Sequence, residues 1–373
     1  MEQKELLDLY SDYLLASFGA TTATGLSALV EGKVSHDQIT RFLSGTQKTA
    51  ADLWLHVKPL VLQIQSEEAV LIIDDSIEEK PFTDENDIVC WHYDHSKDRQ
   101  VKGINFLSAL YHSQVQGQVQ GQVQGQVQVQ DVSLPVGFEL IAKTEFYTDA
   151  KTGQPKRRSP TTKNEYCRQL IQQAIKNQLR FRFVLFDVWF SSADNMGFIK
   201  VEQKREFICP LKTNRKVALS RQDKAQGRYQ RLDTLELEDK ARCEVYLEGV
   251  EFPLSLVKQV FVNEDGSTGI LSLVSRDTNI NFDEITTNYR KRWQVECYHK
   301  SLKQNVSLSK SPTQKVTTQT NHFFAALCGF IKLERLKIKT KLNHFALKSK
   351  LYMNALQSAF ETLQKLKPEL TAA

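Results

Sequence analysis

The run AVLIIDD, residues 69–75, decides the fold, because five apolar residues in succession end there in two carboxylates. A continuous apolar run of this length is typical of a strand that is buried on both faces. FRFVLFD, residues 181–187, repeats the pattern and ends at Asp187. Acids at the carboxyl ends of neighbouring buried strands project into one crevice, where α/β sheets usually place their function. The two runs therefore predict an α/β fold with carboxylates at one edge of its sheet.

A third acid falls on a predicted helix, YRKRWQVECYHKSLK, residues 289–303. At about 100° per residue, the spacing Tyr-x2-Arg-x3-Glu-x6-Lys puts all four polar groups on one narrow face. These residues are Tyr289, Arg292, Glu296 and Lys303. An ordinary amphipathic helix with a solvated charged face has similar features. The complete spacing and the two acids that follow the strands favour a functional site instead.

This spacing resembles the Tyr-Arg-Glu-Lys signature of bacterial insertion-sequence transposases of the DDE type, in the IS-four-like group. The resemblance extends in order and spacing from about Leu71 to Lys303. It implies an RNase H-like catalytic domain. The expected fold class is therefore α/β, with a mixed sheet flanked by helices, a β-rich insertion, and helical N- and C-terminal regions.

The resemblance also implies a role for each matching position. Asp74 matches the first acid, which Ser76 follows in the pattern Asp-x-Ser, while Asp75 is the competing candidate. Asp187 and Glu296 match the second and third acids. The remaining signature residues are implied to hold DNA phosphates near the cleaved end, and we add Lys300 to them. These expected DNA contacts are Tyr289, Arg292, Lys300 and Lys303.

Three carboxylates that converge cannot all remain ionised cheaply unless cations neutralise them. Their hard oxygen atoms are the ligands that Mg²⁺ and Mn²⁺ prefer. Two such ions can clamp the attacking and leaving oxygens of an in-line phosphoryl displacement. We therefore expect Asp74, Asp187 and Glu296 to be both catalytic residues and metal ligands, with two Mg²⁺ or Mn²⁺ ions in each site.

The charge of the chain is unevenly distributed. Residues 300–350 carry ten Lys and one Arg against a single acid, although the whole chain has a net charge of only +5. A basic segment in a chain with a carboxylate site points to a polyanion such as nucleic acid. A lysine-rich, solvated helix explains the same count equally well.

The N-terminal residues 1–65 read as four helices, and two short ones joined around Gly32 look like a helix-turn-helix. Gln38, Thr40 and Arg41 are then placed to approach DNA. A plain helical bundle is the alternative.

We expect five segments: a helical DNA-end-binding region at 1–65, catalytic domain at 66–198, a β-rich insertion at 199–267, catalytic domain again at 268–310, and a basic helical region at 311–373.

Six cysteines are scattered without a Cys-x-x-Cys pair, which argues against a zinc site or a disulfide framework and fits a reducing cytoplasm. The N-terminus lacks the features of a signal peptide, and the longest apolar run, residues 323–331, is too short to span a bilayer. We therefore expect a cytoplasmic, nucleoid-associated protein.

His92, Asp94 and His95 fall in an expected polar loop and are more simply surface residues than metal ligands.

Residues 113–131 contain three copies of Gln-Val-Gln-Gly followed by Gln-Val-Gln-Val-Gln. Alternating Val and Gln suit a strand with one apolar face, while the glycines weaken it. The segment is predicted to be an elongated hairpin arm or loop, and its polar edges could pair with another chain.

The function implied by the resemblance is cut-and-paste transposition. Such an enzyme binds the terminal inverted repeats of its own element, cuts their 3′ ends and joins them to double-stranded target DNA. A homodimer on paired ends is expected, because both ends must be cut together. Alternatives are a catalytically inactive, transposase-derived DNA-binding protein and a structure-specific RNase H-like nuclease.

Relatives that excise through DNA hairpins are expected to stack a flipped base on an aromatic residue, often a Trp in the inserted β block. No Trp falls in residues 199–267 here. The aromatic residues that could substitute are Tyr229, Tyr246, Phe207, Phe252 and Phe261.

Overall fold

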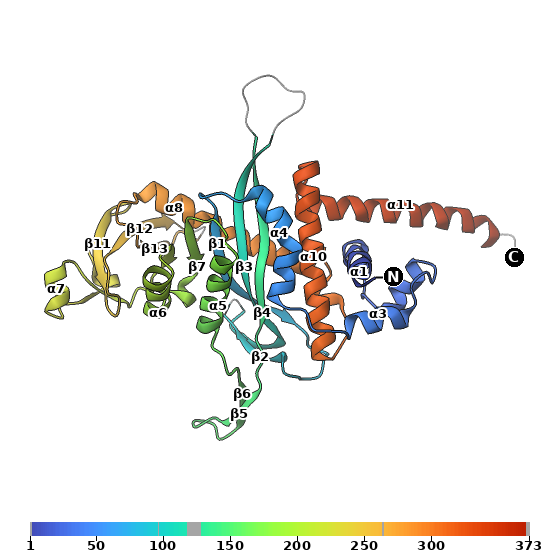
Figure 1. Ribbon diagram of the computed structural model, residues 1–373, viewed down its shortest axis with the longest axis horizontal. Coiled ribbons are helices and arrows are strands. Elements are labelled where there is room, and N and C mark those ends of the chain that lie inside the picture. Colours follow the sequence, from blue (N-terminus) through green and yellow to red (C-terminus); the bar gives the residue numbers. More distant parts are fainter. Residues whose placement is uncertain (1, 96, 118–127, 263–264, 371–373) are drawn as a thin grey trace. The chain divides into compact units, whose positions relative to one another are not determined.

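The computed structural model of the chain describes residues 2–95, 97–117, 128–262 and 265–370 (Figure 1). The chain forms two compact units. The first contains Met1–His56, Ile77–Ile104 and Cys297–Ala373, and the second contains Val57–Ser76 and Asn105–Glu296.

The second unit is built on a mixed sheet, and the two apolar runs form its centre. β1 (Val70–Glu79) lies parallel to β7 (Phe183–Phe186), with Ile73 opposite Phe186. On one side of β1 lies β3 (Arg99–Gly117), which pairs with the antiparallel β4 (Gln128–Leu140). Beyond β7 the order is β8 (Glu206–Pro210), β13 (Thr268–Ser275), β12 (Leu254–Val262), β11 (Arg242–Leu247), β9 (Lys216–Ala218) and β10 (Gln230–Arg231).

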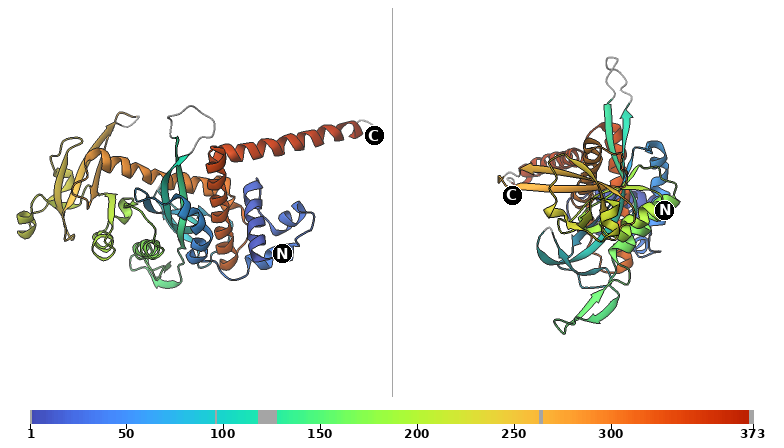
Figure 2. Two further views of the ribbon diagram at one scale, coloured as in Figure 1. Left: turned by 45° about the horizontal axis from the view of Figure 1, so that its top comes forward. Right: turned by 90° about the vertical axis from the view of Figure 1, so that its left-hand side faces the viewer.

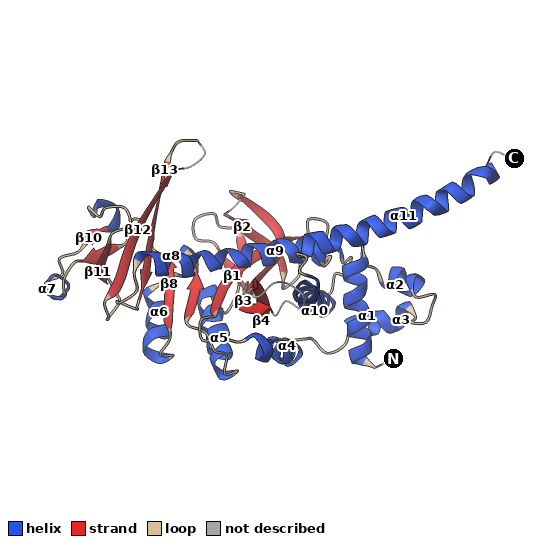
Figure 3. Ribbon diagram, turned by 90° about the horizontal axis from the view of Figure 1, so that it is seen from above, coloured by secondary structure: helices blue, strands red, loops and turns tan. Residues whose placement is uncertain are grey.

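Helices cover both faces of this sheet (Figure 3). α5 (Lys163–Lys176) and α6 (Ala193–Gly197) lie on one face, and α8 (Phe282–Arg290) lies on the other. Residues 70–73 of β1 and 183–186 of β7 are fully buried between these layers, as their composition predicts. Together with helices at both ends of the chain, this arrangement confirms the predicted α/β class, a mixed sheet flanked by helices.

Two local predictions from the sequence are wrong. Residues 89–94, expected in a polar loop, form strand β2 (Val89–Asp94), which pairs with the Arg99–Ile104 part of β3 in the first unit. Residues 289–303 do not form one helix, because a 3-10 turn, Lys291–Trp293, separates α8 from α9 (Gln294–Asn305). In addition, β8 pairs in parallel with β7. The main sheet therefore continues beyond residue 199, and the proposed segment boundaries remain a prediction.

The first unit contains the helical ends of the chain. α1 (Gln3–Ala16) and α3 (His36–Leu43) both pack on α10 (Val316–Thr340), and α2 (Ala23–Leu29) packs on α3. α11 (His344–Leu370) follows α10. α3 begins with a capping box, in which the Ser35 hydroxyl accepts from the Gln38 N–H and the Gln38 side chain accepts from the Ser35 N–H. None of the helices in the described part of the chain is long and apolar enough to cross a membrane.

The ends of the Gln-Val repeat extend the β3–β4 hairpin. Residues 114–117 lie in β3 and residues 128–130 lie in β4, and Gly117 pairs with Gln128. The predicted hairpin arm is therefore confirmed for these flanks. The copies at residues 118–127 fall outside the described residues.

Gly103 of β3 lies where β3 closely approaches the backbone of β1. A Cβ atom at this position would collide with the carbonyl oxygen of Glu78 in β1. Gly103→Ala should lower the free energy of unfolding by about 1–3 kcal/mol, because the backbone must shift to admit the methyl group. Urea unfolding measures the loss. Gly197→Ala is the matched control, since Gly197 has helical φ and open space around it, and should not destabilise.

Buried His322 predicts a pH dependence of stability. The Tyr10 hydroxyl lies 3.0 Å from its Nδ1, and its Nε2 lies 3.1 Å from the Leu308 carbonyl oxygen. Burial, with a smaller contribution from the charge of Lys80, lowers the pKa of His322 from 6.5 to about 4. As pH falls through this range the unfolded chain gains a proton that the folded chain does not. The free energy of unfolding should therefore fall by about 3 kcal/mol.

The measurement is chemical unfolding between pH 7 and pH 4 for wild type and His322→Gln. The amide can keep both hydrogen bonds but does not titrate, so the variant should show a smaller loss of stability over this range. Identical pH profiles for the two proteins would contradict the assignment.

Candidate active site

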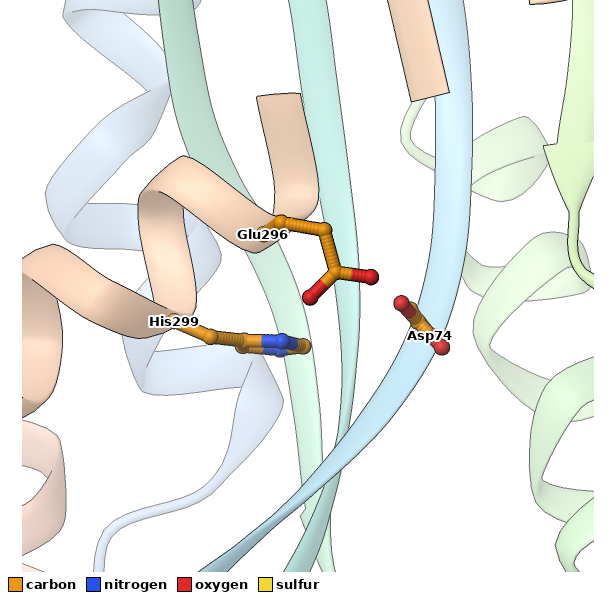
Figure 4. A group of neighbouring side chains, drawn as sticks. All are labelled: Asp74, Glu296 and His299. Atoms are coloured by element: carbon orange, nitrogen blue, oxygen red, sulfur yellow. The ribbon is translucent and has the colours of Figure 1, made fainter. Parts of the chain in front are cut away.

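The three predicted acids come together in the second unit. Asp74 and Asp187 each follow one residue after the paired Ile73 and Phe186, so the parallel register sets the two acids side by side. Glu296 lies in the first turn of α9, and its carboxylate points towards Asp74 (Figure 4). A carboxylate oxygen of each lies within 4.8 Å of the other.

Arg292 lies between two of these acids. Its Nη1 is 3.2 Å from Asp74 Oδ2, and its Nη2 is 3.5 Å from Glu296 Oε1. Asp74 is only 7% exposed, so its charge is largely removed from water. The planar guanidinium suits this bridging position, because its nitrogen atoms can reach two acceptors at once. Arg292 thus supplies an internal cation to the acidic cluster.

One guanidinium does not neutralise the cluster. Burial, followed by the nearby charge of Asp187, raises the pKa of Asp74 well above its usual value, against the opposing effect of Arg292. Burial also raises the pKa of Asp187, although that carboxylate accepts a hydrogen bond from the Trp189 N–H at 2.9 Å. Both acids therefore lie where a further cation would be stabilised.

The structure distinguishes the two adjacent acids of β1. Successive side chains of a strand point to opposite faces. Asp74 lies beside Arg292, whereas Asp75 pairs with Lys163 of α5, with Asp75 Oδ2 2.7 Å from the ammonium nitrogen. This geometry favours Asp74 over Asp75 as the first acid of the site.

The expected DNA contacts are divided between the two units. Tyr289 and Arg292 belong to the second unit, and burial raises the pKa of the half-buried Tyr289 phenol. The other four belong to the first unit: Lys300, Lys303, Gln38 and Arg41.

Those four side chains differ in their surroundings. Lys303 donates to the Ile77 carbonyl oxygen at 2.9 Å, and the Lys300 ammonium lies 5.2 Å from the centre of the Phe345 ring. Gln38 takes part in the cap of α3, and Arg41 is exposed on the same helix. Lys300 and Arg41 are exposed, whereas Lys303 and Gln38 are half-buried, so the predicted contacts are not equivalent.

A family described as DDE superfamily endonuclease matches residues 1–241. The chain belongs to this family. The matched segment contains Asp74 and Asp187 and ends before Glu296. No curated protein matches the chain. The DDE family name and the site geometry thus agree on an enzyme that acts on DNA.

Three features of this DDE endonuclease were missed in the sequence. Lys163 pairs with Asp75 across 88 positions of chain, and no local pattern predicts that contact. Trp189 lies two residues after Asp187 with 47% of its surface exposed, and the Lys212 ammonium is 5.7 Å from its ring centre. The aromatic residues predicted to stack on a base all lie in the β block, where Phe207 is in fact fully buried and cannot stack on a base.

His299 is the third missed feature. It lies three residues after Glu296 in α9, so the two residues share one face of the helix. The spacing Glu-x-x-His on a helix is a recognisable metal-ligand pattern and could have identified it.

The donor set of this DDE endonuclease fits a divalent metal ion. Asp74, Asp187 and Glu296 offer hard carboxylate oxygens, and burial is the main cause of the raised pKa values of Asp74 and Asp187, so a cation that binds there would stabilise their ionised forms. Hard divalent ions such as Mg²⁺ and Mn²⁺ prefer such oxygens. The three acids would hold the ion.

Metal binding should be visible as a gain in stability. Mg²⁺ or Mn²⁺ at one hundred times its Kd should stabilise the wild type by about 2.7 kcal/mol, because the ion binds only the folded chain. The gain should vanish in Asp74→Asn and Glu296→Gln and persist in the matched control Asp75→Asn. Thermal unfolding with and without metal measures this.

The same series separates ligand loss from misfolding. Without metal at pH 7, Asp74→Asn should be at least as stable as wild type, because it removes a buried charge whose pKa is raised. A carboxyl group whose pKa is raised by folding lowers the free energy of unfolding at every pH above its pKa in the unfolded chain. The stability advantage of Asp74→Asn should therefore disappear as pH falls towards 3.8. A metal effect equal in all four proteins would contradict the site.

Proposed function

We propose that this protein is a DDE transposase that cuts the ends of its own insertion sequence and transfers the freed 3′-hydroxyl ends to target DNA. The observation that carries the proposal is the convergence of Asp74, Asp187 and Glu296 around Arg292. Three acids on two neighbouring strands and a helix supply metal ligands but no side-chain nucleophile. Phosphoryl transfer to water or to a hydroxyl group needs none.

The chemistry requires two successive displacements at phosphorus. In the first, a water oxygen bonds to the phosphorus and the 3′-oxygen leaves, which frees a 3′-hydroxyl at the element end. In the second, that 3′-oxygen bonds to a phosphorus of the target and a target 3′-oxygen leaves. Two divalent ions would supply activation of the entering oxygen and stabilisation of the leaving oxygen.

The residues of the chain position these groups. Asp74 and Asp187 are held on parallel strands, and Glu296 is held on a helix, so the metal ligands are fixed by rigid elements. Arg292 orients Asp74 and Glu296 through the two ends of its guanidinium. Burial of Asp74 strengthens the attraction between these acids and any cation that enters.

Residues outside the acidic cluster are also expected to bind DNA. We infer that Tyr289, Arg292, Lys300 and Lys303 contact phosphates near the cut, and that α3 contacts the terminal repeat through Gln38 and Arg41. The exposed position of Arg41 supports this role. The capping contact of Gln38 leaves its amide nitrogen as the group that would meet DNA. Membership of an IS-four-like group, and a homodimer on paired ends, belong to the same proposal.

The exposed Trp189 is a candidate for stacking on an unpaired DNA base near the site. Its backbone N–H donates to Asp187 and its side chain is exposed, so an exposed aromatic residue lies two positions from a proposed metal ligand. An aromatic face of this kind stacks on bases regardless of their sequence. Excision through a DNA hairpin would use such a surface, although the β block itself carries no Trp.

The test is cleavage of a duplex carrying the element's own terminal repeat, with Mg²⁺ or Mn²⁺. Wild type should nick the repeat boundary, and Asp74→Asn, Asp187→Asn and Glu296→Gln should each reduce the rate by at least about a thousandfold, because each loses a metal ligand. Asp75→Asn is the matched control and should retain most activity. Gel analysis of end-labelled strands measures the rates.

The other outcomes distinguish the alternatives. Tight binding of the repeat without cleavage in either metal would contradict the enzyme and indicate a DNA-binding relic. Metal-dependent cleavage that follows DNA shape and ignores the terminal repeat would indicate a structure-specific nuclease.

A further inference from the structure

A short two-stranded ribbon stands apart from the main sheet of the second unit. It is formed by β5 (Glu145–Thr148) and β6 (Pro155–Arg158), which among the described strands pair only with each other. The ribbon projects away from β3 and β4 in both Figure 1 and the right-hand view of Figure 2. All of its strand residues are exposed or half-buried. The ribbon therefore contributes little to the core.

Cross-strand contacts hold this ribbon in shape. Phe146 lies opposite Arg157, whose guanidinium carbon is 5.7 Å from the centre of its ring. Arg158 makes the same kind of contact with Tyr147 at 5.7 Å and also pairs with Glu145 at 2.9 Å. An isolated two-stranded hairpin is marginally stable in water. These contacts therefore stabilise a surface element that the core does not need.

The contacts also fix the direction of two arginines. Phe146 and Tyr147 are successive strand residues, so they face opposite sides of the ribbon. Each side thus has one arginine whose guanidinium carbon lies 5.7 Å from the centre of an aromatic ring. The ribbon segment 145–158 has four basic residues against two acidic ones, and Phe146 is 75% exposed. The Phe146 face therefore carries Arg157, and the Tyr147 face carries Arg158 and Lys156 beside Glu145.

The base of the ribbon lies beside the acidic edge of the sheet. β6 ends at Arg158, and α5 begins five residues later at Lys163, so the connecting chain spans at most roughly 17 Å. Lys163 pairs with Asp75, the neighbour of Asp74. Asp75 points to the face opposite Asp74, so the ribbon is tethered on the α5 face at this end of β1, and a duplex that is cut at Asp74 and passes this edge of the sheet would reach it.

We propose that the β5–β6 ribbon enters the major groove of the duplex next to the cleaved end, and that Arg157 and Arg158 contact the phosphates on its two sides. This inference rests on the proposed action on DNA. A two-stranded ribbon is narrow enough for the major groove, and cations on both faces match the two phosphate walls of that groove. The chemical complement of such a surface is duplex DNA. The exposed aromatic rings keep the guanidinium groups extended before DNA arrives.

The experiment measures duplex binding over a range of salt concentrations in a chelating buffer, so that cleavage does not interfere. The probe is a duplex with the terminal repeat, and the variant is Arg157→Gln with Arg158→Gln. Each neutralised phosphate contributes about 0.9 to the slope of log K against log salt. The double variant should therefore lower the magnitude of that slope by roughly 1.8 and weaken binding at low salt.

A matched control removes the same charge elsewhere in the same unit. Arg228 and Arg231 are exposed and paired with Asp223 and Asp233, as surface arginines commonly are. Arg228→Gln with Arg231→Gln should leave the slope unchanged. Phe146→Ala and Tyr147→Ala together should weaken binding without a full loss of slope, because the charges stay while their support is lost.

The results separate this inference from the proposed function. Unchanged slope and affinity in the Arg157 and Arg158 variant would overturn the ribbon contact even if the protein cuts DNA. An equal fall in slope for both arginine pairs would also overturn it, since a general charge effect would then explain the data. A wild type that binds DNA but never cuts it would contradict the transposase proposal. The salt dependence of binding by the ribbon variants would still test the ribbon contact. Unchanged metal-induced stabilisation in these variants would show that the main site is intact.

Discussion

The buried negative charge at the end of β1 is the constraint on which the rest of the site depends. Asp74 is nearly inaccessible to water and faces two other acids, so its ionised form is costly unless cations are supplied. The chain supplies one cation itself through Arg292. The remaining negative charge attracts metal ions. The packed strands and the packed helix hold the acids close together despite their repulsion.

The break between α8 and α9 shows how that arrangement is accommodated. An uninterrupted α-helix would place Arg292 and Glu296 by its regular period alone. Instead, Arg292 lies in a tighter 3-10 turn, and Glu296 lies in the first turn of the next helix. The guanidinium still spans from Asp74 to Glu296. A mid-helix 3-10 segment often marks a functional position, and here it carries the residue that joins the strand to the helix.

The sequence predicted the central features because they depend on local patterns. Apolar runs that end in acids identified β1 and β7, and the parallel pairing of those strands follows from ordinary α/β architecture. Helix caps are equally local, since Ser35 caps α3 and Thr162 caps α5. What local patterns do not contain is pairing at a distance. Lys163 pairs with Asp75 only because α5 folds back over the strand, and β8 joins β7 through a register that residues 205–212 alone do not encode.

The basic C-terminal segment shows why a count of charges does not locate a nucleic-acid surface. Lys332 pairs with Asp8 and Asp12 of α1, and Lys348 donates to the carbonyl oxygens of Leu15 and Ser17. These lysines link helices of the first unit, so part of the charge that suggested a polyanion partner serves the fold. In the β5–β6 ribbon, by contrast, aromatic rings contact the half-buried Arg157 and the exposed Arg158 on an element that contributes little to the core. The direction in which a cation is held, and the cost of holding it there, indicate a DNA contact better than net charge does.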